Sequence, residues 1–194
     1  MTRSKLFNEN DVLDKAVQLF WCKGYHGTSA QDLVDALGIS RSSLYDTFGD
    51  KRQLYIKALQ QYRSVAAKGL INMIEESTQI DKTVEQIFRM AVKESLADKL
   101  TKGCFVVNTT VELAPHDKEI ASIINENMND IEDALCLGIK KGQEQGVFTK
   151  HQNARAFARF LFNNISGLRV AAKSGADKKV FDDIVRVTLS VLKK

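Results

Sequence analysis

The chain has 194 residues, of which 44% are hydrophobic and 27% charged, as in a globular protein of one domain or of two small domains sharing a core. No apolar run reaches the roughly 18 residues that a membrane-spanning helix needs, and the opening residues, MTRSKLFNENDVLDK, lack the apolar block of a signal peptide. We therefore expect a cytoplasmic protein without a membrane partner. The net charge of +4 is too small to indicate nucleic-acid binding by itself.

Cysteine and histidine usage argues against catalysis and metal binding. Three widely spaced cysteines in a chain without an export signal predict reduced thiols rather than a disulfide. The three histidines are scattered, and the sequence contains no metal-ligand spacing, no phosphate-binding glycine loop and no nucleophile elbow. We expect no catalytic residue, no metal and no cofactor.

The first 50 residues predict three short helices. The first helix carries an apolar stripe at helical spacing and ends at Gly24. Thr28 then begins the tetrapeptide TSAQ, which predicts a capping box between Thr28 and Gln31. The second helix stops at Gly38, and Ser40 is expected to cap the third.

Helical patterns continue to the end of the chain. Asp50 is expected to cap a helix that runs to about Ser77. Further helices are predicted at about 81–99, 103–114, 118–145, 152–174 and 178–193. The fold class is therefore all-α, with about nine helices and no convincing strand.

The third helix has two different faces. Leu44 and Phe48 lie four residues apart, so they share a face that must be buried against the preceding helices. At about 100° per residue, Ser42 and Asp46 then lie opposite that face. The whole outer face is small and polar, and it comprises Arg41, Ser42, Ser43, Tyr45 and Asp46. Two short helices joined at Gly38 predict a helix-turn-helix whose second helix enters a DNA major groove.

The stretch GYHGTSAQDLVDALGISRSSLYDTFGDKRQLY resembles the DNA-binding headpiece of TetR-family transcriptional regulators. The resemblance implies a headpiece at residues 1–52 and a helical effector-binding and dimerisation domain at residues 53–194. It also implies phosphate contacts for Thr28, Tyr45 and Lys51. Lys51 follows the Asp50 cap, where backbone donors and an ammonium group together suit a phosphate. The other positions expected at the DNA are Ser29 on the supporting helix and Arg41, Ser42, Ser43, Asp46 and Thr47 on the recognition helix.

Asp46 and Thr47 depart from the family pattern, which often has an aromatic, histidine or basic residue there. Phosphates repel a carboxylate on the groove face unless it accepts a hydrogen bond from a cytosine amino group. One hypothesis is that Asp46 reads a cytosine. The alternative is a solvated side chain or a neighbour of Arg41.

The last two helices are the candidate dimerisation surface. In the family these helices pack against their copies as a four-helix bundle, which implies a homodimer and a pseudo-palindromic operator in double-stranded DNA. The alternative is that they complete the core of one protomer. The residues expected to pair are Phe157, Leu161, Ile165, Leu168, Phe181, Ile184 and Val185.

A polar row marks the segment GCFVVNTTVELAP. Cys104, Asn108 and Glu112 recur every four residues on an otherwise apolar helix. Such a row either lines a ligand cavity or forms the solvated edge of a core helix. The family resemblance favours a cavity for a small-molecule effector, with Phe88, Met128 and Phe162 as further walls.

Cys104 raises a separate hypothesis. It follows Gly103 at a helix start with Lys99 and Lys102 close in sequence, and both the helix dipole and an ammonium group lower a thiol pKa. Some family members that sense electrophiles have a similar Gly-Cys at this place, so an inducer acting covalently on Cys104 is one possibility. The alternative is a small buried apolar residue, the role we also expect for Cys22 and Cys136.

The sequence therefore predicts a ligand-responsive transcriptional regulator that binds its operator as a homodimer. Repression rather than activation is the habit of the family, and the effector, the operator sequence and the regulated genes are not predicted. The rival interpretation is a helical protein-interaction module without DNA binding. Such a module would not need Arg41, Tyr45 and Lys51 around a recognition face, and it would show no salt-dependent affinity for DNA.

Overall fold

Nine α-helices and no strand make up residues 7–193, the part of the chain that the computed structural model describes. Residues 1–6 and 194, at the ends of the two predicted domains, lie outside it. Within the described range, no helix is long and apolar enough to cross a membrane. The expected all-α class with nine helices is confirmed. The helices are α1 (Glu9–Lys23), α2 (Ala30–Leu37), α3 (Arg41–Phe48), α4 (Lys51–Glu75), α5 (Ile80–Ala97), α6 (Phe105–Glu112), α7 (Lys118–Glu144), α8 (Ala154–Lys173) and α9 (Lys178–Ser190).

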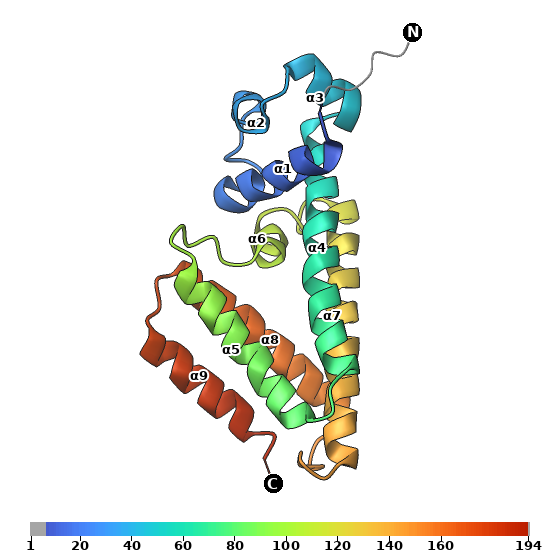
Figure 1. The fold of residues 1–194 in the computed structure, drawn as a ribbon, viewed down its shortest axis with the longest axis vertical. Helices are drawn as coiled ribbons and strands as arrows, with labels where there is room; N and C mark the ends of the chain where they lie inside the picture. The colour runs from blue at the N-terminus through green and yellow to red at the C-terminus, as the bar shows by residue number, and fades with distance from the viewer. Residues whose placement is uncertain (1–6, 194) are drawn as a thin grey trace.

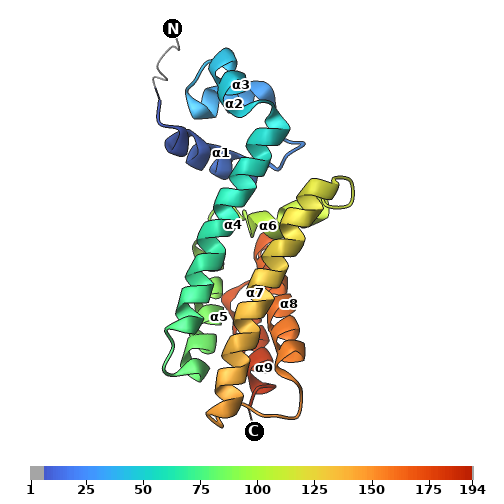
Figure 2. The same cartoon turned by 90° about the vertical axis from the view of Figure 1, so that its right-hand side faces the viewer.

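The molecule is elongated, with the headpiece helices α1, α2 and α3 at one end (Figure 1). The long helix α4 leads from α3 toward the opposite end and packs along α7, as Figure 2 shows from the side. Helices α5, α8 and α9 form the part farthest from the headpiece, and α6 lies between them and α1. Helix α4 runs without a break through residue 53, where the domain boundary was predicted. The boundary between residues 52 and 53 remains a prediction.

Two hydrophobic cores follow from this arrangement. The first joins the headpiece to α6 and the first half of α7, so that Phe20 and Leu44 belong to the same cluster as Phe105 and Ile120. The second lies among α5, α8, α9 and the second half of α7. The headpiece therefore does not have a core of its own, because the residues that support α3 pack in the same cluster as α6 and α7.

The caps of the headpiece helices are mostly as expected. Gly38 ends α2 in the left-handed conformation with φ 70°, while Ser40 and Asp50 cap α3 and α4 with their side chains. The capping box of α2 is one residue later than predicted. The Ser29 side chain accepts from the backbone N–H of Asp32, and the Asp32 carboxylate accepts from the N–H of Ser29.

Candidate nucleic-acid interface

The outer face of α3 is the candidate DNA-reading surface. Leu44 and Phe48 are buried, with 1% and 4% of their surface exposed, so the predicted inner face of this helix is confirmed. Arg41, Tyr45 and Asp46 are exposed. Ser42 is also exposed, whereas Ser43 and Thr47 are half-buried at the sides of the helix. Their roles at DNA remain predictions.

Hydrogen bonds organise the N-terminal turn of α3. The Ser40 hydroxyl caps the helix and lies 3.0 Å from the Ser42 hydroxyl and 2.9 Å from that of Ser43. The Arg41 guanidinium points to the side-chain oxygen of Gln31 on α2, at 3.5 Å, rather than to Asp46. The N-terminal turn therefore presents small hydroxyl groups and one exposed cation, groups that suit close approach to a DNA groove.

Lys51 begins α4 beside this surface. Its ammonium nitrogen lies 4.4 Å from the centroid of the Tyr25 ring, within cation–π distance. Burial lowers the pKa of Lys51, and the carboxylates of Glu112 and Asp32 act in the opposite direction. The lysine is thus held in place by an aromatic ring from the loop between α1 and α2.

Thr28 lies at the end of the α1–α2 loop. Only 1% of its surface is exposed, and its hydroxyl donates a 2.6 Å hydrogen bond to the carbonyl of Gly24. The side chain thus helps to close the loop, and its phosphate contact remains a prediction. The neighbouring Ser29 is exposed as the cap of α2, where the positive end of the helix dipole lies.

An ion pair that the sequence did not reveal anchors the start of α4. Arg52 donates to both oxygens of Asp117, at 2.7 and 2.9 Å, and to Glu119 at 2.8 Å. Pairing with Arg52 lowers the pKa of Asp117, and the two carboxylates raise that of Arg52. Both acids lie at the N-terminus of α7, so this pair fixes α4 against α7 next to the headpiece.

The three residues of the predicted polar row on α6 contact different neighbours. Glu112 accepts hydrogen bonds from the backbone of the α1–α2 loop, and the side-chain amide of Asn108 donates to the carbonyl of Lys102. The Cys104 sulfur accepts from the Tyr62 hydroxyl at 3.7 Å. Each side chain therefore makes a structural contact, and its role in effector binding remains a prediction.

The predicted apolar walls are also separate. Phe88 is fully buried in the core of α5, α8 and α9, and Phe162 packs against that same core. Met128 packs against the other core, next to the headpiece. Met128 and the two phenylalanines thus lie against different cores, and their assignment to an effector site remains a prediction.

A cavity of about 740 Å³ lies instead between α1, α4, α5 and α8. Its apolar lining includes Trp21, Tyr62, Met73, Ile87, Met90 and Ile165, and polar groups of Gln18, Gln61, Glu94 and Arg169 also line it. The lining comes from four helices that are distant in sequence, so no local pattern revealed it. Trp21, the one tryptophan of the chain, is half-buried in this lining.

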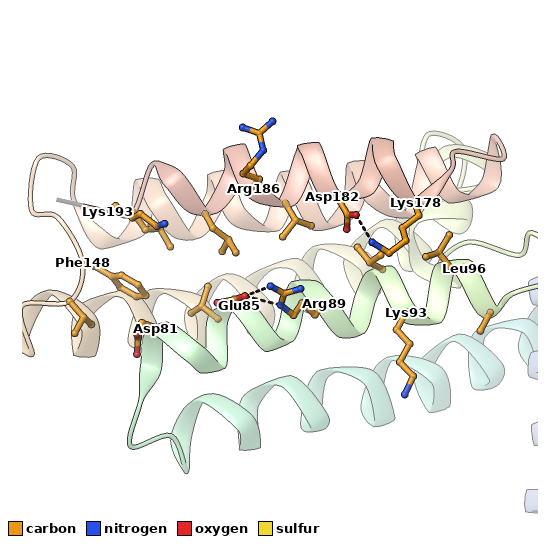
Figure 3. Close-up of a pocket in the computed structure, with 17 residues that line it drawn as sticks. Asp81, Glu85, Arg89, Lys93, Leu96, Phe148, Lys178, Asp182, Arg186 and Lys193 are labelled. Atoms are coloured by element: carbon orange, nitrogen blue, oxygen red, sulfur yellow. Dashed lines mark hydrogen bonds and ion pairs between the residues drawn. The ribbon is translucent and has the colours of Figure 1, made fainter.

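A groove of about 1010 Å³ runs between α5 and α9 (Figure 3). Val84, Val92 and Val185 contribute to its apolar floor. Two pairs of its charged side chains lie along the helices, Arg89 with Glu85 on α5 and Lys178 with Asp182 on α9. Lys93 and Lys193 also line the groove.

The candidate dimerisation residues divide into two groups. Phe157, Leu161, Leu168 and Phe181 are buried inside the protomer, so their side chains belong to its core and their part in pairing remains a prediction. Ile165, Ile184 and Val185 are half-buried, and Ile165 lines the cavity while Val185 lines the groove. The inner faces of α8 and α9 therefore pack in the core of the protomer. The exposed apolar residues on the same two helices are Phe160, Val170, Val180 and Val187.

The cysteines are free thiols in three different environments. Cys136 is buried, as expected for a core residue, but Cys22 is exposed on α1, which corrects its predicted core position. Cys104 is half-buried at the N-cap of α6. Lys102, which was expected beside this thiol, places its ammonium 4.2 Å from the centroid of the Trp21 ring and donates to Gln18.

A helix-turn-helix with a polar outer face, mounted on a larger helical domain, defines a DNA-binding transcriptional regulator of two parts. Two family models match the chain. Residues 12–58 match the family of bacterial regulatory proteins of the tetR family, and residues 79–188 match the tetracyclin repressor-like C-terminal domain. The chain belongs to the TetR family of transcriptional regulators.

Similar proteins cover almost the whole chain. The uncharacterized HTH-type transcriptional regulator YezE of Bacillus subtilis (strain 168) is 34% identical over 99% of this chain and 100% of its own length. The HTH-type transcriptional repressor ComR of Escherichia coli (strain K12) is 29% identical, over 96% of this chain and 90% of its own. Among solved structures, a cysteine mutant of the regulator CifR, complexed with 26bp double-strand operator DNA, has a TM-score of 0.86 at 22% identity and covers 98% of this chain and 99% of its own.

Proposed function

We propose that this regulator is a repressor that binds a pseudo-palindromic operator as a homodimer and is released by a small-molecule effector. The observation that carries the proposal is the exposed polar face of α3 beside Lys51, mounted on buried Leu44 and Phe48. ComR, named a repressor, and the CifR complex with operator DNA support the same assignment. Such a protein acts where the DNA is, in the cytoplasm.

Dimerisation is supported by the outer stripe of α8 and α9. Between 40% and 54% of the surface of Phe160, Val170, Val180 and Val187 is exposed in the protomer, an unfavourable state for four large apolar side chains on adjacent helices. Packing against a second copy removes this surface from water. Two headpieces at a fixed separation then read two half-sites.

The cavity between α1, α4, α5 and α8 is the proposed effector site. Its volume suits a small molecule, and its walls combine aromatic and aliphatic side chains with a few polar groups, as ligand pockets generally do. Trp21 and Gln18 belong to α1, so an occupant touches the headpiece and the regulatory helices at once. An effector that fits only one relative position of α1 and α5 shifts the protein toward that state.

Covalent induction through Cys104 remains a second candidate. The thiol is half-buried and lies at the N-cap of α6, where it accepts a hydrogen bond from the Tyr62 hydroxyl. The ammonium of Lys102, one of the two lysines expected near it, lies instead over the Trp21 ring and donates to Gln18. Replacing Cys104 with Ser separates the two modes of induction, because only a covalent inducer loses its effect.

The test of DNA binding is selection of bound fragments from a random DNA pool at near-physiological salt, with Tyr45→Ala as the control. We expect enrichment of one pseudo-palindrome and an affinity about tenfold lower for the control, because an exposed recognition-helix contact is lost without loss of the core. Compounds that release the fragment should change the fluorescence of Trp21, the one tryptophan in the chain.

A folded protein that enriches no sequence, in the absence of any bound effector, contradicts the proposal. That result favours a helical protein-interaction module. Equal enrichment by the wild type and by Tyr45→Ala would place the DNA contact elsewhere on the molecule.

A further inference from the structure

The last residue of α6 is bound to the headpiece through backbone atoms. The carboxylate of Glu112 accepts a 2.7 Å hydrogen bond from the N–H of His26 and a 3.1 Å bond from the N–H of Tyr25. Both donors lie in the loop between α1 and α2. This loop also supplies the Tyr25 ring on which Lys51 rests.

The position of Glu112 is locally unfavourable. A negative charge in the last turn of a helix meets the negative end of the helix dipole, and it destabilises an isolated helix. Two backbone N–H groups from another element offset this cost, because hydrogen bonds to a charged acceptor are among the stronger ones. Glu112 destabilises its own helix but is stabilised by hydrogen bonds from the α1–α2 loop. This combination indicates that its role is to connect α6 with that loop.

Gly24 leaves room for the contact. This residue ends α1 with φ 75°, and a Cβ atom added to it would lie 2.9 Å from one carboxylate oxygen of Glu112. Any other residue at this position would therefore be strained in its backbone and would press on the carboxylate. The glycine at position 24 and the two N–H donors at Tyr25 and His26 therefore both accommodate the carboxylate of Glu112.

The other end of α6 is held to α1 as well. The Trp21 indole donates a 3.2 Å hydrogen bond to the carbonyl of Gly103, and the Lys102 ammonium donates to the side chain of Gln18 at 3.1 Å. As Figure 1 shows, α6 lies directly beside α1, between the headpiece and the remaining helices. The segment from Lys102 to Glu112 therefore spans α1 and the loop that follows it.

We propose that Glu112 is a positioning residue for DNA binding: its carboxylate fixes the α1–α2 loop, and with it the Tyr25 ring on which Lys51 rests, so that α6 holds this part of the headpiece in its binding orientation. The inference rests on the proposed function in that the bound polymer is DNA. The contact itself is a property of the protein alone.

Whether removal of Glu112 weakens or strengthens DNA binding distinguishes a positioning residue from a charge that is merely nearby. Glu112 lies close enough to Lys51 to raise its pKa, so its negative charge opposes binding of a phosphate there. If Glu112 were only a nearby charge, its removal would strengthen DNA binding. If it positions the loop, its removal weakens DNA binding although the protein becomes more positive.

The experiment compares Glu112→Ala and Glu112→Gln with wild type in two measurements, hydrogen exchange of the Tyr25 and His26 amides and affinity for the selected DNA fragment. Glu144→Ala is the matched control, because Glu144 is likewise the last residue of its helix but is exposed at the end of α7 far from the headpiece. We expect Glu112→Ala to speed exchange of both amides about tenfold and to weaken DNA binding about tenfold. Glu112→Gln keeps an acceptor oxygen, so we expect its amide exchange and its DNA affinity to lie between those of Glu112→Ala and wild type.

Unchanged exchange of the two amides in Glu112→Ala overturns the contact, whether or not the protein binds DNA. Faster exchange with equal or tighter DNA binding overturns the positioning role and leaves Glu112 as a structural contact. A wild-type protein that selects no DNA counts against the proposed function, and in that case the exchange measurement still decides the contact.

Discussion

At the scale of single residues, Asp46 is the least expected group on the DNA-reading face. It is exposed on α3, and the guanidinium that was considered as its partner lies against Gln31 instead. The side chain is therefore free to point into a groove. A carboxylate there is tolerated only where a base offers it a donor, and in the major groove cytosine does so through its amino group.

Replacing Asp46 with Asn tests this reading. We expect one position in each half-site to lose its preference for cytosine, with a change of about 1–3 kcal/mol in discrimination against the other bases. Comparison of the sequences selected by the two proteins measures this. Asp35→Asn on α2 is the control, since it removes the same charge from an exposed headpiece position that bonds Gln31. Identical base preferences for wild type and Asp46→Asn would rule the hypothesis out.

At the scale of helices, the junction of α4 and α7 holds the headpiece support in place. Arg52 at the start of α4 binds both oxygens of Asp117, which is also the N-cap of α7. Because this pairing lowers the pKa of Asp117 in the folded state, the folded protein favours the carboxylate. The resulting stability is complete above the unfolded pKa of about 3.9, and it is lost as the pH falls through the lower folded value.

Asp117→Asn removes the charge and keeps a good N-cap residue. We expect a lower free energy of unfolding than wild type near neutral pH, and convergence of the two proteins in acid, where Asp117 of the wild type is protonated. Denaturant unfolding at a series of pH values measures this. Asp182→Asn, which removes an exposed pair within α9, serves as control with a smaller effect. A constant difference between Asp117→Asn and wild type at every pH would contradict the assignment.

At the scale of the whole molecule, local patterns predicted the helices and long-range packing decided the sites. The spacing of Leu44 and Phe48 was enough to orient α3, because one face of a short helix must be buried. Helical spacing did not predict that Phe157 and Leu161 are buried within the protomer, since an apolar stripe does not say whether its partner is the same chain or a second copy. Nor could the polar row on α6 predict the contacts of Glu112, because the partners of Glu112 lie 86 and 87 residues earlier.

The cavity between α1 and α5 was beyond sequence analysis for the same reason. Its walls come from four helices, and only the folded chain brings Trp21 to Met90 and Ile165. The proposed effector cavity touches both the headpiece, through α1, and the proposed pairing surface, through α8. Helix α8 contributes to the cavity and also to the exposed stripe proposed for pairing. The proposed function requires two headpieces that bind one DNA together.

The most direct test is the affinity and mass of the complex on the selected pseudo-palindrome, compared with the same DNA carrying an insertion of about 5 base pairs, half a helical turn, between its half-sites. The account predicts two protomers per duplex and an affinity at least about tenfold lower after the insertion, because one headpiece then faces the wrong side of the duplex. One protomer per duplex, or equal affinity for both DNAs, would contradict it.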